Sequence, residues 1–523
     1  MAQQNQPVRP ISPVEKKIIE IGTTDNHVMD HLDVLTNRIG GRLIGSASYE
    51  EAVKWLLAEY DKLGIKAWTE VAGTLPVGFD RGPWSGRMYG DGIAMDLHFV
   101  TPSYTSGTHG LQRGHVVMEP KTQAQFERMR HKLKGAWVLI GGKSDGFPVN
   151  KTAKGDSIRE AAKAENAAIS ERNDANRRRN WEEGTSIPME PLKEVPALFY
   201  REMVDAGVLG FIQSADVPLR ALYDRQMLND TIHPASFDSI PWQVEVKLDH
   251  KQFDRIAELV KERHDIIIEL DVRNHFRHGP VEYSSVIAEI PGTEFPDEYV
   301  IISGHLDAYD VATGGVDCGT GIGPMLEAAR LLALSGAKPR RTIRFVAFAG
   351  EEFGLLGAHA YAKAHADELP RISMLLNRDG GPTPTVGMRI PEAMKHDIEI
   401  ATAAVAGVNP EYPFEITIAQ PRKRPTSTGG TDASVFDLEG VPTHGFVNRD
   451  FKGYDFDYGE IWHTERDIFN KEIPEYQEFT SVVTALTALG IANLDNLLSR
   501  DGMYLDESAA AAESKKKKSS KKK

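Results

Sequence analysis

The strongest constraint on the fold is a regular alternation of apolar strands and helices that begins at Ser285. Short apolar runs, typical of buried strands, alternate with longer segments that have helical spacing. The strand candidates are SVIAEI, YVIISG, TIRFVAFAG and ISMLLN, and the helix candidates among them are GPMLEAARLLAL and LLGAHAYAKAH. This alternation predicts an α/β fold in which a mostly parallel mixed sheet is flanked by helices on both faces. A last helical run, 472–498, closes the fold.

Histidine and acidic residues follow these strands, at the positions where an open α/β sheet binds its ligands. YVIISG runs into His305, and Asp307 lies two residues later on the same side of an extended chain, from where it can hydrogen-bond the imidazole. TIRFVAFAG runs into Glu351 and Glu352, and ISMLLN is followed by Asp379. We therefore expect these side chains to meet at one edge of the sheet.

Two further candidate ligands lie in loops. Asp317 belongs to the glycine-rich segment VATGGVDCGTGIG, and His463 belongs to IWHTERD, which follows an aromatic-rich loop. Each motif is weak by itself, because an isolated acidic pair is usually a solvated surface feature. Together they indicate a metal site, since buried carboxylates without cations would repel one another. Cys318 is the only cysteine, so we expect histidine and carboxylate ligands rather than a cysteine-built site.

Charge and ligand counting favours two zinc ions. Their positive charges would balance the carboxylates Asp317, Glu352 and Asp379 together with one hydroxide. If Asp317 bridges the two ions, each zinc takes one histidine, one terminal carboxylate, one Asp317 oxygen and a shared water. Periodicity alone does not distinguish Glu351 from Glu352 as the ligand of this pair.

The motifs GHLDAYD, GGVDCGTG, RTIRFVAFAGEEFGLLGAHAYAK, LLNRDGG and WHTERD resemble those of metallopeptidase family 28, the co-catalytic zinc aminopeptidases and the carboxypeptidase Q group. They follow the family's order over roughly residues 285–500. The resemblance implies the zinc-exopeptidase fold and peptide hydrolysis by a water that bridges two zinc ions. It implies these zinc ligands: His305, Asp317, Glu352, Asp379 and His463. It makes Asp317 the bridge, Glu351 the general base and Asp307 the residue that orients a ligand.

The length of 523 residues favours two or more domains, or one large domain that carries an insertion. The pattern of residue types changes over residues 105–249. Short strand candidates there surround a charged segment, 151–180, which is typical of an exposed helix. In its position and its pattern of residue types, the insertion is similar to a protease-associated domain. Such a domain could cap the cleft that contains the expected metal site. We expect a discontinuous peptidase domain, 1–104 and 250–505, and a disordered lysine-rich tail, 506–523.

Composition disfavours several other classes of protein. Hydrophobic residues form 41% of the chain and charged residues 26%, as in globular proteins. Without the lysines of 515–523, 54 basic side chains stand against 75 acidic ones, which disfavours nucleic acid as a partner. No apolar run is long enough to span a membrane. The polar start, 1–10, predicts a secreted or periplasmic protein if a signal peptide was removed, and a cytoplasmic protein otherwise.

The expected substrates are short peptides, and the chain could form a homodimer. The segment TSTGGTDASVF, with Gly430 and Asp432, resembles the family's loop near the specificity pocket. Tyr454 or Tyr458 could hydrogen-bond the oxyanion, although aromatic loop residues more often pack. The basic run 422–424 could bind a substrate carboxylate, although a solvated surface is the favoured interpretation.

Two other functions are compatible with parts of this pattern. A single-zinc glutaminyl cyclase is a transferase with the same fold, and metal stoichiometry distinguishes it from a two-zinc peptidase. An inactive receptor-like binding protein is disfavoured because all five ligands and Glu351 are present. Within the peptidase hypothesis, aminopeptidase, dipeptidase and carboxypeptidase action all fit the sequence.

Overall fold

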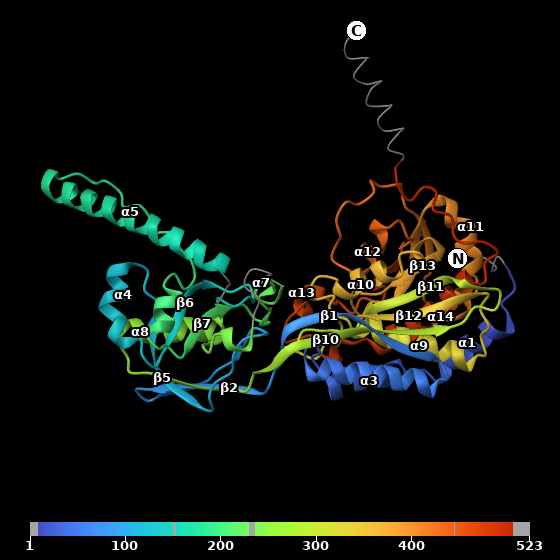
Figure 1. Cartoon of the computed structure of the whole chain (residues 1–523), viewed down its shortest axis with the longest axis horizontal. Coiled ribbons are helices and arrows are strands. Elements are labelled where there is room, and N and C mark those ends of the chain that lie inside the picture. Colours follow the sequence, from blue (N-terminus) through green and yellow to red (C-terminus); the bar gives the residue numbers. More distant parts are fainter. Residues whose placement is uncertain (1–8, 150–152, 230–235, 444, 506–523) are drawn as a thin grey trace, which may run out of the picture.

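The structure is a computed structural model that describes residues 9–149, 153–229, 236–443 and 445–505. These residues form two lobes that lie next to each other along the longest axis of the molecule (Figure 1). The tail 506–523, predicted to be disordered, lies outside the described residues. Every helix in the described ranges is too short or too polar to cross a lipid bilayer.

The first lobe is built on a mixed sheet. Its strand order is β1 (Lys66–Asp80), β10 (His275–Ile290), β12 (Arg341–Phe348), β11 (Phe295–His305) and β13 (Ile372–Asn377). β11 runs parallel to β12 and β13, whereas β10 is antiparallel to β12 and to β1. The predicted α/β fold is confirmed, and the parallel pairs of this sheet are those of β11 with β12 and with β13. These strands bring their carboxyl ends to the same edge of the sheet.

Alternating side chains of the central strands pack on two different faces of the sheet. The first face is covered by α3 (Ala47–Lys62), α9 (Gly319–Leu334) and α14 (Pro474–Ala492), and the second by α10 (Leu356–Ala364) and α12 (Ala433–Leu438). Val300 and Ile302 of β11 belong to the first core, and Ile301 between them belongs to the second. Because both faces are covered, these strands are continuously apolar in sequence.

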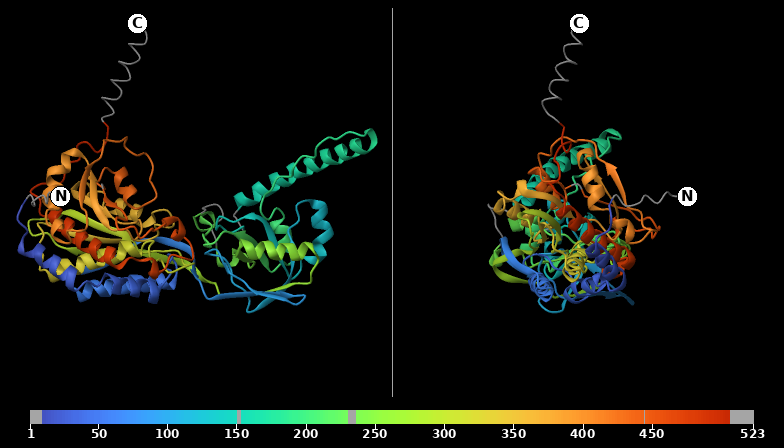
Figure 2. Two further views of the ribbon diagram at one scale, coloured as in Figure 1. Left: turned by 180° about the vertical axis from the view of Figure 1, so that it is seen from behind. Right: turned by 90° about the vertical axis from the view of Figure 1, so that its right-hand side faces the viewer.

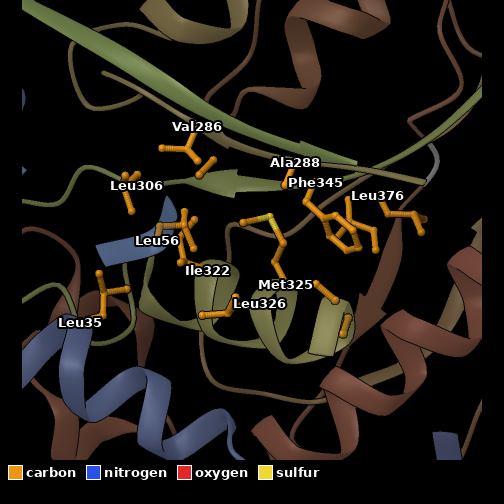
Figure 3. Packing of buried hydrophobic residues seen from close by; sticks show 14 of the residues in the cluster. Leu35, Leu56, Val286, Ala288, Leu306, Ile322, Met325, Leu326, Phe345 and Leu376 are labelled. Atoms are coloured by element: carbon orange, nitrogen blue, oxygen red, sulfur yellow. The ribbon is translucent and has the colours of Figure 1, made fainter. Parts of the chain in front are cut away.

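The first core joins α9 to the central strands. Figure 3 shows residues of α9 and of the strands in contact within this cluster: Ile322, Met325, Leu326, Val286, Ala288, Phe345 and Leu376. All of them are buried. Helices α1 (Pro13–Thr24) and α2 (Val28–Leu32) extend this side by packing against α14 and α9. The packing fixes α9, and with it the loop that contains Asp317 in front of the helix.

Smaller elements complete the first lobe. A short sheet has the order β15 (Glu415–Ile418), β14 (Thr385–Ile390) and β16 (Phe446–Asn448). Helix α11 (Lys395–Ala401) packs against α14, and the short helix α13 (Tyr458–Ile461) lies just before His463. Ser46 caps the first turn of α3, and Gly64, with φ of +68°, follows its end.

The second lobe contains a larger sheet. Its order is β3 (Ile93–Asp96), β2 (Trp84–Gly90), β9 (Ile267–Val272), β5 (Gln112–Met118), β6 (Ala136–Lys143), β7 (Gly210–Ala215), β8 (Val244–Asp249) and β4 (Phe99–Val100). The helices α4 (Gln123–Met129), α6 (Tyr200–Asp205) and α8 (His250–Lys261) belong to this lobe. The sheet extends beyond the predicted segment 105–249, because β2, β3 and β4 precede that segment and β9 follows it. The extent of this sheet is set by pairing between strands that are distant in sequence, rather than by the local pattern of residue types.

Two long antiparallel strands, β1 and β10, connect the lobes (Figures 1 and 2). The sequence indicates irregular chain over 73–92, but the structure forms the second half of β1 and then β2 there. The register of β1 shifts at Ala72, just before Gly73, and again at Pro76. The second bulge accommodates a proline, which is unsuited to a regular ladder. A β-carbon at Gly73 would lie 2.4 Å from the hydroxyl of Tyr283, so the glycine permits this close approach.

Helix α5 (Ala153–Glu183) projects from the second lobe as an arm (Figure 1). It confirms the exposed charged helix predicted from the sequence. The chain returns along α5 as segment 187–193, held by asparagines at seven-residue spacing. Each amide exchanges two hydrogen bonds with the backbone of one returning residue: Asn166 with Lys193, Asn173 with Glu190, and Asn180 with Ile187. Seven-residue spacing keeps the three amides on one helix face.

Candidate metal centre

The structure brings the candidate ligands and the candidate base together at the carboxyl edge of the central sheet. His305 ends β11, Glu351 and Glu352 follow β12, Asp379 follows β13, and Asp317 precedes α9. His463 follows α13 in a backbone conformation with φ of +58°. Residues separated by more than 150 positions in sequence therefore share one site.

Asp317 lies between the two histidines. Its Oδ1 is 3.1 Å from Nε2 of His305, and its Oδ2 is 3.6 Å from Nε2 of His463. His305 Nε2 is also 3.4 Å from Oδ1 of Asp379, and His463 Nε2 is 2.9 Å from Oε2 of Glu352. Each histidine thus has its own acidic neighbour and shares Asp317, which is the arrangement expected of a bridging carboxylate between two cations.

The orientation of His305 comes from the main chain rather than from the expected side chain. Nδ1 of His305 is 2.8 Å from the carbonyl oxygen of Asp307, whereas the nearer carboxylate oxygen is 3.7 Å away. A carbonyl only accepts hydrogen bonds, so Nδ1 carries the proton and Nε2 is left as the ligand atom. The Asp307 carboxylate instead accepts hydrogen bonds from the backbone N–H groups of Glu351, at 3.1 Å, and Glu352, at 3.2 Å.

Two buried residues outside the predicted set hold the loops in place. Asp467 accepts hydrogen bonds from the backbone N–H groups of Val316, at 2.6 Å, and Asp317, at 3.3 Å. Arg42 donates to the carbonyls of the loops after β11 and before α9: Leu306, Thr313 and Gly314. Asp467 belongs to the same WHTERD motif as His463, which is a signal that sequence reasoning could have used.

The charge balance of the site fits bound divalent cations. Burial raises the pKa of the Glu351 and Glu352 carboxyls, and nearby carboxylates raise it further. Oε1 of Glu352 is buried without a hydrogen-bond partner in the described structure, and so are both carboxylate oxygens of Asp432. A cluster of acids with unused oxygen atoms is costly unless cations neutralise it. Imidazole and carboxylate oxygen are suitable donors for zinc.

Cys318 lies beside the site. With His305 and Asp379 it forms a group close enough to hold an ion. Its Sγ donates a hydrogen bond to the carbonyl of Arg378 at 3.2 Å, and burial raises the pKa of the thiol. A protonated thiol that is already a donor is a poor metal ligand, which supports the interpretation of Cys318 as a small buried neighbour.

The site opens into a cavity of about 640 Å³. Its lining includes four of the clustered acids, Asp317, Glu351, Glu352 and Asp379, together with His463. Gly430 and Tyr458, two of the candidates for substrate contact, also line the cavity. Burial and the proximity of Asp317 raise the pKa of Tyr458, so its hydroxyl stays protonated and can donate a hydrogen bond.

Other candidates for substrate contact lie elsewhere. Tyr454 is 52% exposed and bonds Glu475 rather than facing the cavity. In the basic run 422–424, Arg422 pairs with Asp437 and Arg424 donates to the carbonyl of Leu438. The cation that lines the cavity is Arg225 of α7 (Arg225–Asn229), which contributes from the second-lobe side of the chain and which no sequence motif singled out.

A family model described as Peptidase family M28 matches residues 285–487. Over 238 residues the chain is 28% identical to carboxypeptidase Q of Xenopus laevis, covering 45% of this chain and 47% of that protein. It is 23% identical to carboxypeptidase Q of Homo sapiens over 502 residues, covering 93% of this chain and 90% of the human protein. In several such matches the chain spans about half the length of the curated relative.

Solved structures share the fold. A peptidase M28 precursor from Shewanella amazonensis SB2B superimposes with a TM-score of 0.57 at 21% identity, covering 93% of this chain and 97% of that one. BSAP, a zinc aminopeptidase from Bacillus subtilis, superimposes with a TM-score of 0.52 at 14% identity, covering 95% and 99%. At these identities the likeness concerns the arrangement of helices and strands.

Proposed function

Because the chain belongs to peptidase family M28, represented by its residues 285–487, we propose that it is a two-zinc exopeptidase that hydrolyses short peptides. The observation that carries the proposal is the position of Asp317, whose two oxygens face different histidines. A bridging carboxylate between two ligand sets is characteristic of two-metal hydrolytic sites.

The short distances suggest which side chains would hold each ion. One zinc would take His305, Asp379 and Oδ1 of Asp317. The second would take His463, Glu352 and Oδ2 of Asp317. This division gives each ion one imidazole, one terminal carboxylate and half of the bridge, which leaves room for water and substrate.

When bound, the zinc ions would supply the Lewis acidity that makes water a nucleophile near neutral pH. Glu351 lines the cavity beside them and is the proposed general base. It accepts a proton from the attacking water and delivers it to the amine that leaves when the C–N bond breaks. Tyr458 lines the same cavity, and its hydroxyl, which hydrogen-bonds Asp317, is the proposed donor to the oxygen that gains negative charge.

Exopeptidase action is supported by the wall around the cavity. Arg225 and the loop containing Gly430 line it together with the metal-binding residues. At about 640 Å³ the cavity has the size of a small-molecule site, and the end of a peptide fits such a site more readily than the middle of a long chain.

Metal removal tests this function. A chelator should abolish hydrolysis of a free dipeptide, added Zn²⁺ should restore it, and metal analysis should find two zinc ions per chain. A doubly blocked peptide serves as the control and should resist cleavage. Undiminished turnover by the metal-free protein would contradict a metallopeptidase, and a single zinc ion per active chain would favour the cyclase alternative.

A further inference from the structure

Residues 219–225 of the second lobe contact the loops that contain Glu352 and His463. Arg220 forms a backbone bridge with Thr464, the residue after His463. The Tyr223 hydroxyl donates to the carbonyl of Glu352 at 3.0 Å. The Tyr223 ring also stacks on Phe353, with centroids 4.2 Å apart and planes inclined by 19°. This segment is therefore held beside both His463 and Glu352, the two residues proposed to hold the second zinc ion.

Arg225 follows at the end of this segment, and its guanidinium lies directly over Gly354. A β-carbon at Gly354 would lie 2.2 Å from Nη2 and 2.7 Å from Cζ of Arg225. Gly354 has φ of +101°, so the turn after Glu352 both requires glycine and leaves space for the guanidinium. Within the described part of the chain, Arg225 lines the cavity and has no acidic partner.

A second guanidinium, that of Arg220, contacts a residue of the cavity wall without lining the cavity itself. Arg220 lies over the ring of Trp462, with 4.8 Å from its Cζ to the ring centroid. Trp462 lines the cavity and stacks on His463, with ring centroids 4.2 Å apart. Nε of Arg220 is buried and has no hydrogen-bond partner among the described residues. Stacking on the indole fixes the guanidinium plane and leaves this donor unused.

Arg225, which lines the cavity, and Arg220, which lies behind Trp462, differ from the acids of the cavity. The acids at its floor are committed to zinc or to proton transfer under the proposed function, whereas the two arginines have no acidic partner among the residues described. A planar guanidinium is suited to binding a carboxylate through two parallel hydrogen bonds. A free peptide always carries one carboxylate at its C-terminus.

We propose that Arg225, supported by Arg220, binds the C-terminal carboxylate of the substrate. The inference rests on the proposed peptidase function and narrows it to short peptides with a free carboxyl end, as in dipeptidase or carboxypeptidase action. An acidic substrate side chain has the same chemistry, so the test separates the two sources of carboxylate.

The experiment compares three substrates of the zinc-loaded enzyme: Ala-Ala, Ala-Ala amide and Ala-Asp amide. The wild type should prefer Ala-Ala to its amide. Arg225→Ala should reduce this preference roughly 10- to 100-fold, mainly through KM, because a charge-assisted bidentate contact is lost. Arg225→Lys should retain part of it, and Arg220→Ala should show a smaller loss. Arg178→Ala, a change of an exposed arginine on α5, is the matched control and should retain the full preference.

Each alternative result has a distinct meaning. An unchanged preference in Arg225→Ala would overturn the inference, and so would a wild type that prefers Ala-Asp amide to Ala-Ala. Circular dichroism and zinc content of each variant exclude misfolding as the cause of a loss. If the wild type hydrolyses none of the three peptides, the peptidase function itself fails, independently of how Arg225 behaves.

Discussion

Both lobes contain parallel strands, but the charged residues at the strand ends behave differently. In the first lobe, acids and histidines after β11, β12 and β13 converge, and several acidic oxygens have no protein donor. In the second lobe, Lys143 at the end of β6 pairs with Asp216 just after β7 at 2.7 Å, with both side chains about two-thirds exposed. The candidate metal site thus lies where buried acids lack protein donors, whereas the strand ends of the second lobe carry an exposed ion pair.

The largest expected effect lies within the first lobe and separates two adjacent acids. Glu351→Gln keeps the size of the side chain but removes the proposed base, so turnover should fall by ~10² to 10⁴ while zinc stays bound. Glu352→Gln should lower the zinc content, because a neutral amide is a poorer ligand than a carboxylate. Metal analysis beside steady-state kinetics decides the assignment. The roles are reversed if Glu351→Gln loses zinc and Glu352→Gln keeps it.

A smaller effect is expected from a residue that holds a ligand without touching the ion. Asp467→Ala removes the acceptor of the Val316 and Asp317 N–H groups. Zinc affinity should weaken by about 10- to 100-fold, as is usual when a ligand loses its orienting partner. Competition with a fluorescent chelator measures it. Asp216→Ala, in the second lobe, is the control, and an equal effect of the two changes would erase the distinction between the lobes.

The smallest effect on catalysis is expected in the arm. Asn173→Ala removes both hydrogen bonds to Glu190, so the returning segment should be cleaved faster by a protease while peptide hydrolysis stays unchanged. Asn176→Ala, on the same helix but without a hydrogen bond described for its side chain, should retain wild-type resistance. A fall in turnover for Asn173→Ala would show that the arm acts on the site.

Much of the first lobe was predictable from local pattern. Strands that are covered on both faces of a sheet are continuously apolar, so they are recognisable in sequence. The residues that follow such strands lie at one edge of the sheet, which is why His305, Glu351, Glu352 and Asp379 could be identified as candidates. The family resemblance added the roles of individual residues, which periodicity did not distinguish. The same local reasoning failed over 73–92, because pairing with β10 holds Gly73 in the ladder and bulges at Ala72 and Pro76 absorb the irregular positions.

The sequence by itself determined the α/β class and the order of the candidate ligands along the chain, because periodicity and strand ends are local properties. Only the tertiary structure decided that the main-chain carbonyl of Asp307 orients His305, that Asp467 supports Asp317, and that Arg225 lies over Gly354. The first contact, between residues two apart, depends on the backbone conformation after β11. The other two depend on how loops that are distant in sequence pack together, and no local spacing encodes them.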